Sequence, residues 1–137
     1  MKKIIILMCI AFLIPLAGLS PANETLYIQK ATPIQPLEHI WLAVCMVESS
    51  GNPLAYNSNE KAVGIAQIRQ IRITDFNKQT GKSYQLKEMY DPKKSKEVFM
   101  FFALKIGEEN TDIVIRKWNG SGRKTYEYLA KVKKQIK

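Results

Sequence analysis

The sequence of 137 residues predicts a single, mainly α-helical domain of about five helices with little room for sheet. Apolar residues recur at spacings of three and four in several segments, which places their side chains on one face of a helix. Gly, Pro and Asn separate these segments where helices begin or end. With 46% hydrophobic residues, a chain of this length buries one ordinary core and leaves no room for a second domain.

The first predicted helix begins at Leu37, and Pro36 suits its first turn because the fixed φ angle of proline is helical there. One face of this helix carries residues at spacings of four, three and four: Leu37, Trp41, Val44 and Glu48. Such a stripe is expected to face the core. A stretch rich in Ser, Asn, Gly and Pro then ends the helix and predicts an irregular loop over residues 49–59.

Two helices are predicted in the middle of the chain. A short segment over residues 63–68 leads into the first, which Gly81 ends. Asp91 and Pro92 supply an N-cap and a first-turn proline for the second, which runs to Gly107. The apolar residues of this second helix are Val98, Phe99, Phe102, Ala103 and Ile106. We expect its Phe residues, like Trp41, to lie in the core.

Two further helices complete the prediction. Thr111 is expected to cap the first, which ends at a loop over residues 118–122. The last helix carries four residues on one side: Tyr128, Leu129, Val132 and Ile136. The chain contains no internal repeat.

The start of the chain predicts a signal peptide over residues 1–22. Lys2 and Lys3 precede an uncharged apolar run over residues 4–19, and small residues lead up to Ala22, after which cleavage is expected. The alternative is a retained signal anchor, because the run lies near the lower limit for spanning a bilayer. We therefore expect export to the periplasm or cell envelope, with membrane contact only if the leader is retained. An extended lead-in is expected over 23–36 and the folded helical domain over 37–137.

The charge favours an acidic partner. Removing the two leader lysines from the 21 Lys and Arg residues leaves 19, against 12 acidic residues, a net charge of +7. In the cytoplasm this balance would suggest nucleic acid. In an exported protein the expected partners are instead the polymers and lipid head groups of the envelope, and we do not expect nucleic acid to bind.

Neither cysteine nor histidine predicts a cofactor. Once the leader and its Cys9 are removed, Cys45 is the only thiol, which excludes an internal disulfide and a metal site built on cysteine pairs. Cys45 lies in an apolar helical stretch and is expected to behave as a small buried hydrophobe. His39 is the only histidine and has no partner pattern for a metal or a triad. We expect neither a metal nor an organic cofactor.

Glu48 does not fit its surroundings, because an ionised carboxylate is costly to bury on an apolar stripe. One interpretation is that this helix-terminal side chain turns outward to water. The other is functional: a partly desolvated carboxyl has a raised pKa and stays protonated near neutrality, as a general acid must. The polar loop that follows it is rich in Asn, whose amide donors and acceptors suit sugar hydroxyls.

The residues around Glu48 resemble the motifs of soluble lytic transglycosylase (SLT) catalytic domains. Glu48-Ser49 with Pro53 and Ala55 resembles the E-S-x-x-x-P-x-A motif. Gly64-Ile65-Ala66-Gln67 resembles the G-L-M-Q motif. Met89-Tyr90-Asp91-Pro92 resembles the L-x-D-P segment, and Trp118-Asn119-Gly120 resembles the A-Y-N-x-G segment. The closing T-x-x-Y-V-x-K-V pattern is matched by Thr125, Tyr128, Leu129, Lys131 and Val132. Lys61, Ala66 and Lys117-Trp118 depart from the family pattern.

The resemblance covers about residues 37–136 and implies a lysozyme-like, goose-type α domain of five to seven helices. It implies that Gln67 and Asn119 contact the sugar and that Gly64 lets the backbone pass close to the substrate. Gly64 is otherwise a turn glycine and Asn119 part of a turn pair.

The resemblance leaves two readings open for each of two further residues. Ser49 bonds the catalytic carboxyl or an acetamido group, or it bonds its own helix backbone. Tyr128 contacts Glu48 or the sugar through its hydroxyl, or it only packs.

The resemblance also implies an activity and its rivals. Glu48 would protonate the oxygen between N-acetylmuramic acid and N-acetylglucosamine in peptidoglycan strands and then act as base, giving a 1,6-anhydro product. Ordinary glycosidases use two carboxyl groups, and neither Glu60 nor Asp75 has comparable motif support. The alternatives are a goose-type-lysozyme-like hydrolase and a non-catalytic peptidoglycan-binding assembly factor. A monomer that works locally for a secretion or conjugation apparatus is a further hypothesis.

Overall fold

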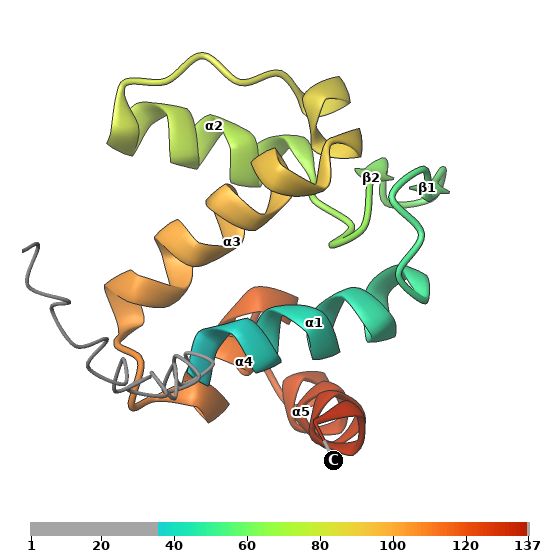
Figure 1. Cartoon of the computed structure of the whole chain (residues 1–137), viewed down its shortest axis with the longest axis vertical. Coiled ribbons are helices and arrows are strands. Elements are labelled where there is room, and N and C mark those ends of the chain that lie inside the picture. The colour runs from blue at the N-terminus through green and yellow to red at the C-terminus, as the bar shows by residue number, and fades with distance from the viewer. Residues whose placement is uncertain (1–35, 137) are drawn as a thin grey trace, which may run out of the picture. The chain divides into compact units, whose positions relative to one another are not determined.

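The computed structural model describes residues 36–136, so the predicted signal peptide at 1–22 and residues 23–35 of the lead-in lie outside the described residues. Within this range the chain forms five α-helices, one 3-10 helix (η1) and one small sheet (Figure 1). Their bounds are α1 Pro36–Ser49, β1 Tyr56–Asn57, β2 Ala62–Val63, α2 Gln70–Thr80, η1 Leu86–Tyr90, α3 Pro92–Ile106, α4 Thr111–Asn119 and α5 Lys124–Gln135. The predicted mainly α-helical fold is confirmed.

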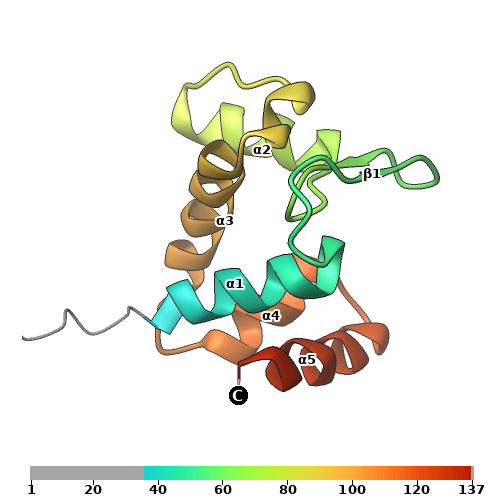
Figure 2. The ribbon, with the colours of Figure 1, turned by 45° about the vertical axis from the view of Figure 1, so that its right-hand side comes forward.

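Helices α1, α4 and α5 pack against one another, and α3 connects this group with α2. Figure 2 shows α3 running from beside α2 to beside α1 and α4. The β1–β2 hairpin follows the C-terminal end of α1, and β2 contacts η1 (Figure 1). The hairpin therefore links the end of α1 to the start of α2.

The core is centred on aromatic residues of three helices. The predicted stripe of α1 is buried, with Leu37, Trp41 and Val44 each at most 5% exposed. Phe99 of α3 contacts Trp41 with ring centroids 5.4 Å apart and contacts Trp118 of α4 at 5.0 Å. These contacts help to hold α1 against α3, because edge and tilted aromatic pairs stabilise beyond the area they bury.

Cys45 is buried in α1 at 3% exposure and is free. Burial raises the pKa of its thiol to about 12, and the negative charge of Glu48 adds to the rise. The prediction of a small buried hydrophobe is confirmed, because such a thiol is protonated and inert at neutral pH.

The predicted irregular loop after α1 contains the first strand of a hairpin. Tyr56 pairs with Val63 in an antiparallel register, and Val63 and Ile68 then exchange two backbone hydrogen bonds of 2.9 Å each. With only two residues, each strand is too short to give the alternating pattern that predicts sheet.

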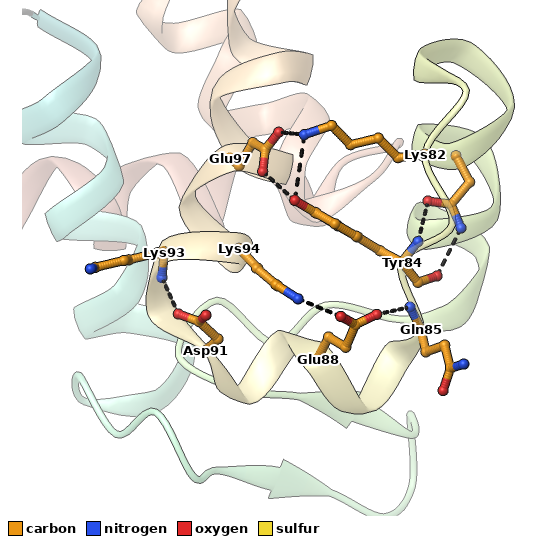
Figure 3. A network of polar contacts seen from close by, with 9 residues as sticks. Lys82, Tyr84, Gln85, Glu88, Asp91, Lys93, Lys94 and Glu97 are labelled. Carbon is orange, nitrogen blue, oxygen red and sulfur yellow. Dashed lines mark hydrogen bonds and ion pairs between the residues drawn. The ribbon is translucent and has the colours of Figure 1, made fainter.

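The segment between α2 and α3 is held by a network of polar side chains (Figure 3). Asn77 of α2 accepts from the Tyr84 amide at 3.0 Å and donates to the Tyr84 carbonyl at 2.8 Å. The Tyr84 hydroxyl donates to Glu97 Oε2 at 2.6 Å, and Lys82 pairs with the same carboxylate. At the start of α3, Asp91 Oδ1 accepts from the Lys93 amide at 2.8 Å, which confirms the predicted N-cap.

Two predicted helix ends were wrong by a residue. Asn110, not Thr111, occupies the N-cap of α4. It makes no side-chain capping bond, and its Nδ2 donates to Ile106 O and Glu109 Oε1. Ile136 follows the end of α5 and is 38% exposed, since the helix ends at Gln135. None of the helices in residues 36–136 has the length and apolarity to cross a membrane.

Candidate active site

Glu48 is the penultimate residue of α1 and lies half-buried in a cleft of about 470 Å³. Val44, one turn earlier, is fully buried, so Glu48 stands where the apolar stripe of the helix reaches the cleft. Burial raises the pKa of the Glu48 carboxyl above its ordinary value, and the negative charge of Glu60 adds to the rise. A carboxyl in this setting can hold a proton nearer neutrality than an exposed one does.

Tyr128 of α5 orients the carboxyl. Its hydroxyl donates to Glu48 Oε1 at 2.6 Å, and its side chain is only 7% exposed. Burial and the negative charge of Glu48 raise the pKa of Tyr128, so the phenol remains a donor. The same hydrogen bond favours the charged form of Glu48 and partly opposes the rise in its pKa. Contact of Tyr128 with a sugar stays a prediction.

Ser49 supports the site through the backbone. Its hydroxyl donates to Ile65 O at 2.7 Å, with Cys45 O at 3.3 Å as a weaker second acceptor. The first bond ties the end of α1 to the segment after β2, and the second is the bond to its own helix that the sequence left open. A contact between Ser49 and a substrate stays a prediction.

Gly64 brings two backbone segments of the protein together. Its φ is +79°, and a Cβ atom at this position would lie 1.9 Å from Met89 O in η1. Its amide donates to Ala55 O at 2.8 Å. The close approach that the structure shows is therefore between the hairpin and η1, and Gly64 is not among the residues that line the cleft. A close approach of Gly64 to a substrate stays a prediction.

Gln67 lines the cleft together with Glu48 and has a φ of +49°, which is unusual for a residue with a side chain. Its Nε2 donates to Gly64 O at 2.9 Å and more weakly to Ala55 O at 3.4 Å. These bonds fix the orientation of the amide. Within residues 36–136, Oε1 accepts no hydrogen bond, and it is the atom of Gln67 available to a ligand.

Asn119 is the last residue of α4, is exposed, and lines the same cleft. The structure thus brings Glu48, Gln67 and Asn119 to one cavity from three separate parts of the chain. Tyr128 stands behind Glu48, while Ser49 and Gly64 hold the adjoining loop.

Several charged residues of the cleft were not predicted. Four line it besides Glu48 and Asp75: Glu60, Arg69, Arg72 and Lys78. Arg72 of α2 is the most enclosed, and burial lowers the pKa of its guanidinium. It lies four residues before the buried Phe76, so its place on an apolar face was visible in the sequence in the same way as that of Glu48.

Besides Glu48, the cleft has two carboxyl groups, those of Glu60 and Asp75. Both are exposed, and Glu60 pairs with Arg69 at 3.8 Å with both side chains about half exposed. A water-exposed pair of this kind contributes little to stability. Both carboxyl groups are therefore accessible to water in the cleft.

The described part of the chain contains no group of three or more His, Cys, Asp or Glu residues that could hold a metal ion. His39 is exposed on α1.

Comparison with known proteins gives one match. Residues 26–99 match the family model of the transglycosylase SLT domain. A search of curated proteins found no match, and neither did a search of solved structures. The matched range includes Glu48 and Gln67, while Asn119 and Tyr128 follow it and reach the site through α4 and α5. Since the match covers more than half of the chain, this protein belongs to the transglycosylase SLT domain family.

Proposed function

We propose that this protein is an exported lytic transglycosylase that cleaves the glycan strands of peptidoglycan, with Glu48 as the acid and then the base. The observation that carries the proposal is the half-buried Glu48 carboxyl, which faces a cleft and accepts a hydrogen bond from Tyr128. Membership of the SLT family supports the substrate class.

In the first step, the protonated Glu48 gives its proton to the oxygen that links N-acetylmuramic acid to N-acetylglucosamine. The bond from this oxygen to C1 of the muramyl residue breaks, and the acetamido group of that residue stabilises the electron-poor carbon. The raised pKa of Glu48 favours this step, because the acid has to be protonated before it reacts.

In the second step, the Glu48 carboxylate takes the proton of the muramyl C6 hydroxyl as that oxygen bonds to C1. Glu48 ends protonated, no water is consumed, and the product carries a 1,6-anhydro bridge. The short hydrogen bond from Tyr128 supports this exchange of roles, because it stabilises the carboxylate that exists between the steps.

Hydrolysis is the second candidate, and a specific observation favours it. Glu60 and Asp75 line the same cleft, and a second carboxyl is what an ordinary glycosidase uses to activate water. A third possibility is binding of the wall without turnover. It is less well supported, because binding alone does not require a carboxyl with a raised pKa at Glu48.

Export to the periplasm or envelope is part of the proposal, supported by the signal-peptide pattern at residues 1–22 and by a substrate that lies outside the cytoplasm. We also propose that the protein cuts the wall locally for a secretion or conjugation apparatus.

The test is digestion of purified peptidoglycan by the mature protein and by its Glu48→Gln variant, followed by mass spectrometry of the fragments. We expect anhydro ends, which are lighter than reducing ends by one water, and their loss in the variant. Reducing ends would establish the hydrolase instead. Equal activity of the two proteins would refute the role of Glu48, and binding without fragments would indicate an assembly factor.

A further inference from the structure

Arg72 lies at the boundary between two cavities. The first is the cleft of Glu48, and the second has a volume of about 410 Å³ and lies among α2, α3 and α4. Arg72, Asp75 and Trp118 line both. A group bound at the boundary would therefore be within reach of a ligand held in the Glu48 cleft.

The guanidinium of Arg72 is held rigidly. It stacks over the ring of Trp118 at 4.5 Å and over that of Phe102 at 5.1 Å. Its Nη2 donates to Trp118 O at 2.8 Å. Two aromatic faces and one hydrogen bond fix the plane of the group, so little rotamer entropy remains to be lost when a ligand binds.

Most donors of this guanidinium are unused. Arginine has five N–H donors, and among residues 36–136 the only hydrogen bond from Arg72 is that of Nη2 to Trp118. No enclosed side-chain nitrogen or oxygen in this part of the chain lacks a partner, so the free nitrogens of Arg72 are open to solvent. A partly buried cation with open donors is suited to a carboxylate.

The surrounding charges agree with an anionic ligand. The second cavity has two more cations, Lys105 and Lys117, both exposed, and one acid, Asp75. Asp75 forms no ion pair with Arg72, and its carboxylate accepts from Gln79 at 2.7 Å instead. Arg72 therefore has no carboxylate partner of its own within the described residues.

We propose that Arg72 binds a carboxylate carried by the muramyl residue of the glycan strand and so selects muramyl strands over uncharged ones. This inference rests on the proposed function. The muramyl residue bears a lactyl group, whose carboxylate is free in a bare strand and is joined to the acidic peptide stem in a substituted one. Both sources offer a carboxylate on the lactyl side of the sugar: the lactyl carboxylate itself in a bare strand, and the D-glutamate carboxylate of the stem in a substituted one.

Binding is measured by calorimetry with the full mature chain carrying Glu48→Gln, so that no ligand is cleaved. The probes are a bare muramyl tetrasaccharide with free lactyl carboxylates, its lactyl amide, and an N-acetylglucosamine tetramer. Stem-bearing strands with D-glutamate or with its amide, D-isoglutamine, form the second arm. We expect the acid form of one arm to bind about tenfold more tightly than its amide, the size of one charge-assisted hydrogen bond. The arm that shows the difference identifies the source.

Adding Arg72→Gln should abolish the preference for the acid while leaving affinity for the N-acetylglucosamine tetramer unchanged. Arg72→Lys should restore part of it, because a lysine keeps the charge and loses the planar fork. Lys117→Gln is the matched control on the second cavity and should keep the preference.

Equal loss of affinity for charged and uncharged ligands would overturn the proposal and show that Arg72 only supports the fold. If Arg72→Gln does not fold, the acid and amide probes are compared on the Glu48→Gln chain with and without Lys117→Gln. Equal affinities for acid and amide overturn the proposal. A preference for the acid that survives Lys117→Gln supports it. Cleavage of peptidoglycan without any acid preference would refute the role of Arg72 alone. Failure to bind or cleave any glycan would refute the proposed function as well.

Discussion

Replacing Gly64 with alanine tests how the hairpin packs against η1, and the chain offers a matched control in Gly81. The two glycines have nearly the same backbone angle, with φ of +79° and +74°. A Cβ at Gly64 would lie 1.9 Å from Met89 O and 2.8 Å from Met89 C, whereas a Cβ at Gly81 meets nothing within 4 Å. The substitutions share a backbone strain and differ only in the collision.

The strain of a left-handed alanine is roughly 1–2 kcal/mol, and both variants carry it. In Gly64→Ala the Met89 carbonyl must also move by about 1.5 Å to reach the 3.4 Å at which ordinary contact begins. Overpacking adds about 1–3 kcal/mol, at the upper end when the obstacle is backbone. The total is therefore about 4–5 kcal/mol for Gly64→Ala, against about 1–2 kcal/mol for Gly81→Ala.

Thermal unfolding followed by circular dichroism measures the difference. For a domain of about this size, each 1 kcal/mol lowers Tm by roughly 4–8 °C. Because the collision adds about 3 kcal/mol, we expect Gly64→Ala to lower Tm by at least about 12 °C more than Gly81→Ala does. Equal shifts in the two variants would refute the close approach of Gly64 to η1, and a stable Gly64→Ala that had lost only activity would restore a role for this glycine at the substrate.

Three further predictions concern Tyr128, Glu48 and Cys45. Tyr128→Phe removes a 2.6 Å bond to Glu48, so kcat/KM should fall by roughly 10- to 100-fold, as for one charge-assisted hydrogen bond, and the alkaline limb of the pH profile should move upward because the bond favours the carboxylate. Glu48→Gln should be more stable than the native chain at high pH. A raised pKa in the folded state contributes stability that is complete below the unfolded pKa of about 4.3 and is lost as pH rises through the folded value. Cys45 has a pKa of about 12 and is buried, so iodoacetamide should label it at neutral pH only after unfolding.

Each of these has a contrary result. An unchanged pH profile in Tyr128→Phe would mean that the hydroxyl does not act on Glu48. A Tm difference between Glu48→Gln and the native chain that stays constant from acidic to alkaline pH would contradict the burial of the carboxyl. Rapid labelling of Cys45 in the folded protein would contradict its packing in α1.

Local patterns predicted the helices well, because the causes of a helix lie within a few residues. Pro36 and Asp91-Pro92 mark where α1 and α3 begin, and Gly81 marks where α2 ends, since these residues act on the backbone next to them. The hairpin was not predicted, because a strand depends on pairing with residues outside its own segment. Tyr56 and Val63 pair across a loop, and strands of two residues leave no periodic trace.

The site divides in a similar way. Glu48 was visible as a carboxyl on an apolar stripe, and the motifs named Gln67 and Asn119, which do line its cleft. The contacts that Gly64 and Ser49 make within the protein were not predicted. Gly64 and Ser49 both carry bonds or contacts to backbone that comes from elsewhere in the chain, at Met89 and Ile65. Arg72 was missed because the motif has no place for it.

By itself, the sequence determined the helical architecture, the isolated carboxyl of Glu48 and the family pattern around it. Only the tertiary structure decided which groups surround that carboxyl. Tyr128 stands 80 positions further along the chain and reaches Glu48 because α5 packs on α1, and the carbonyl of Trp118 meets Arg72 across 46 positions. Periodicity describes one helix at a time, whereas the desolvation and hydrogen bonding that tune an acid arise where helices meet.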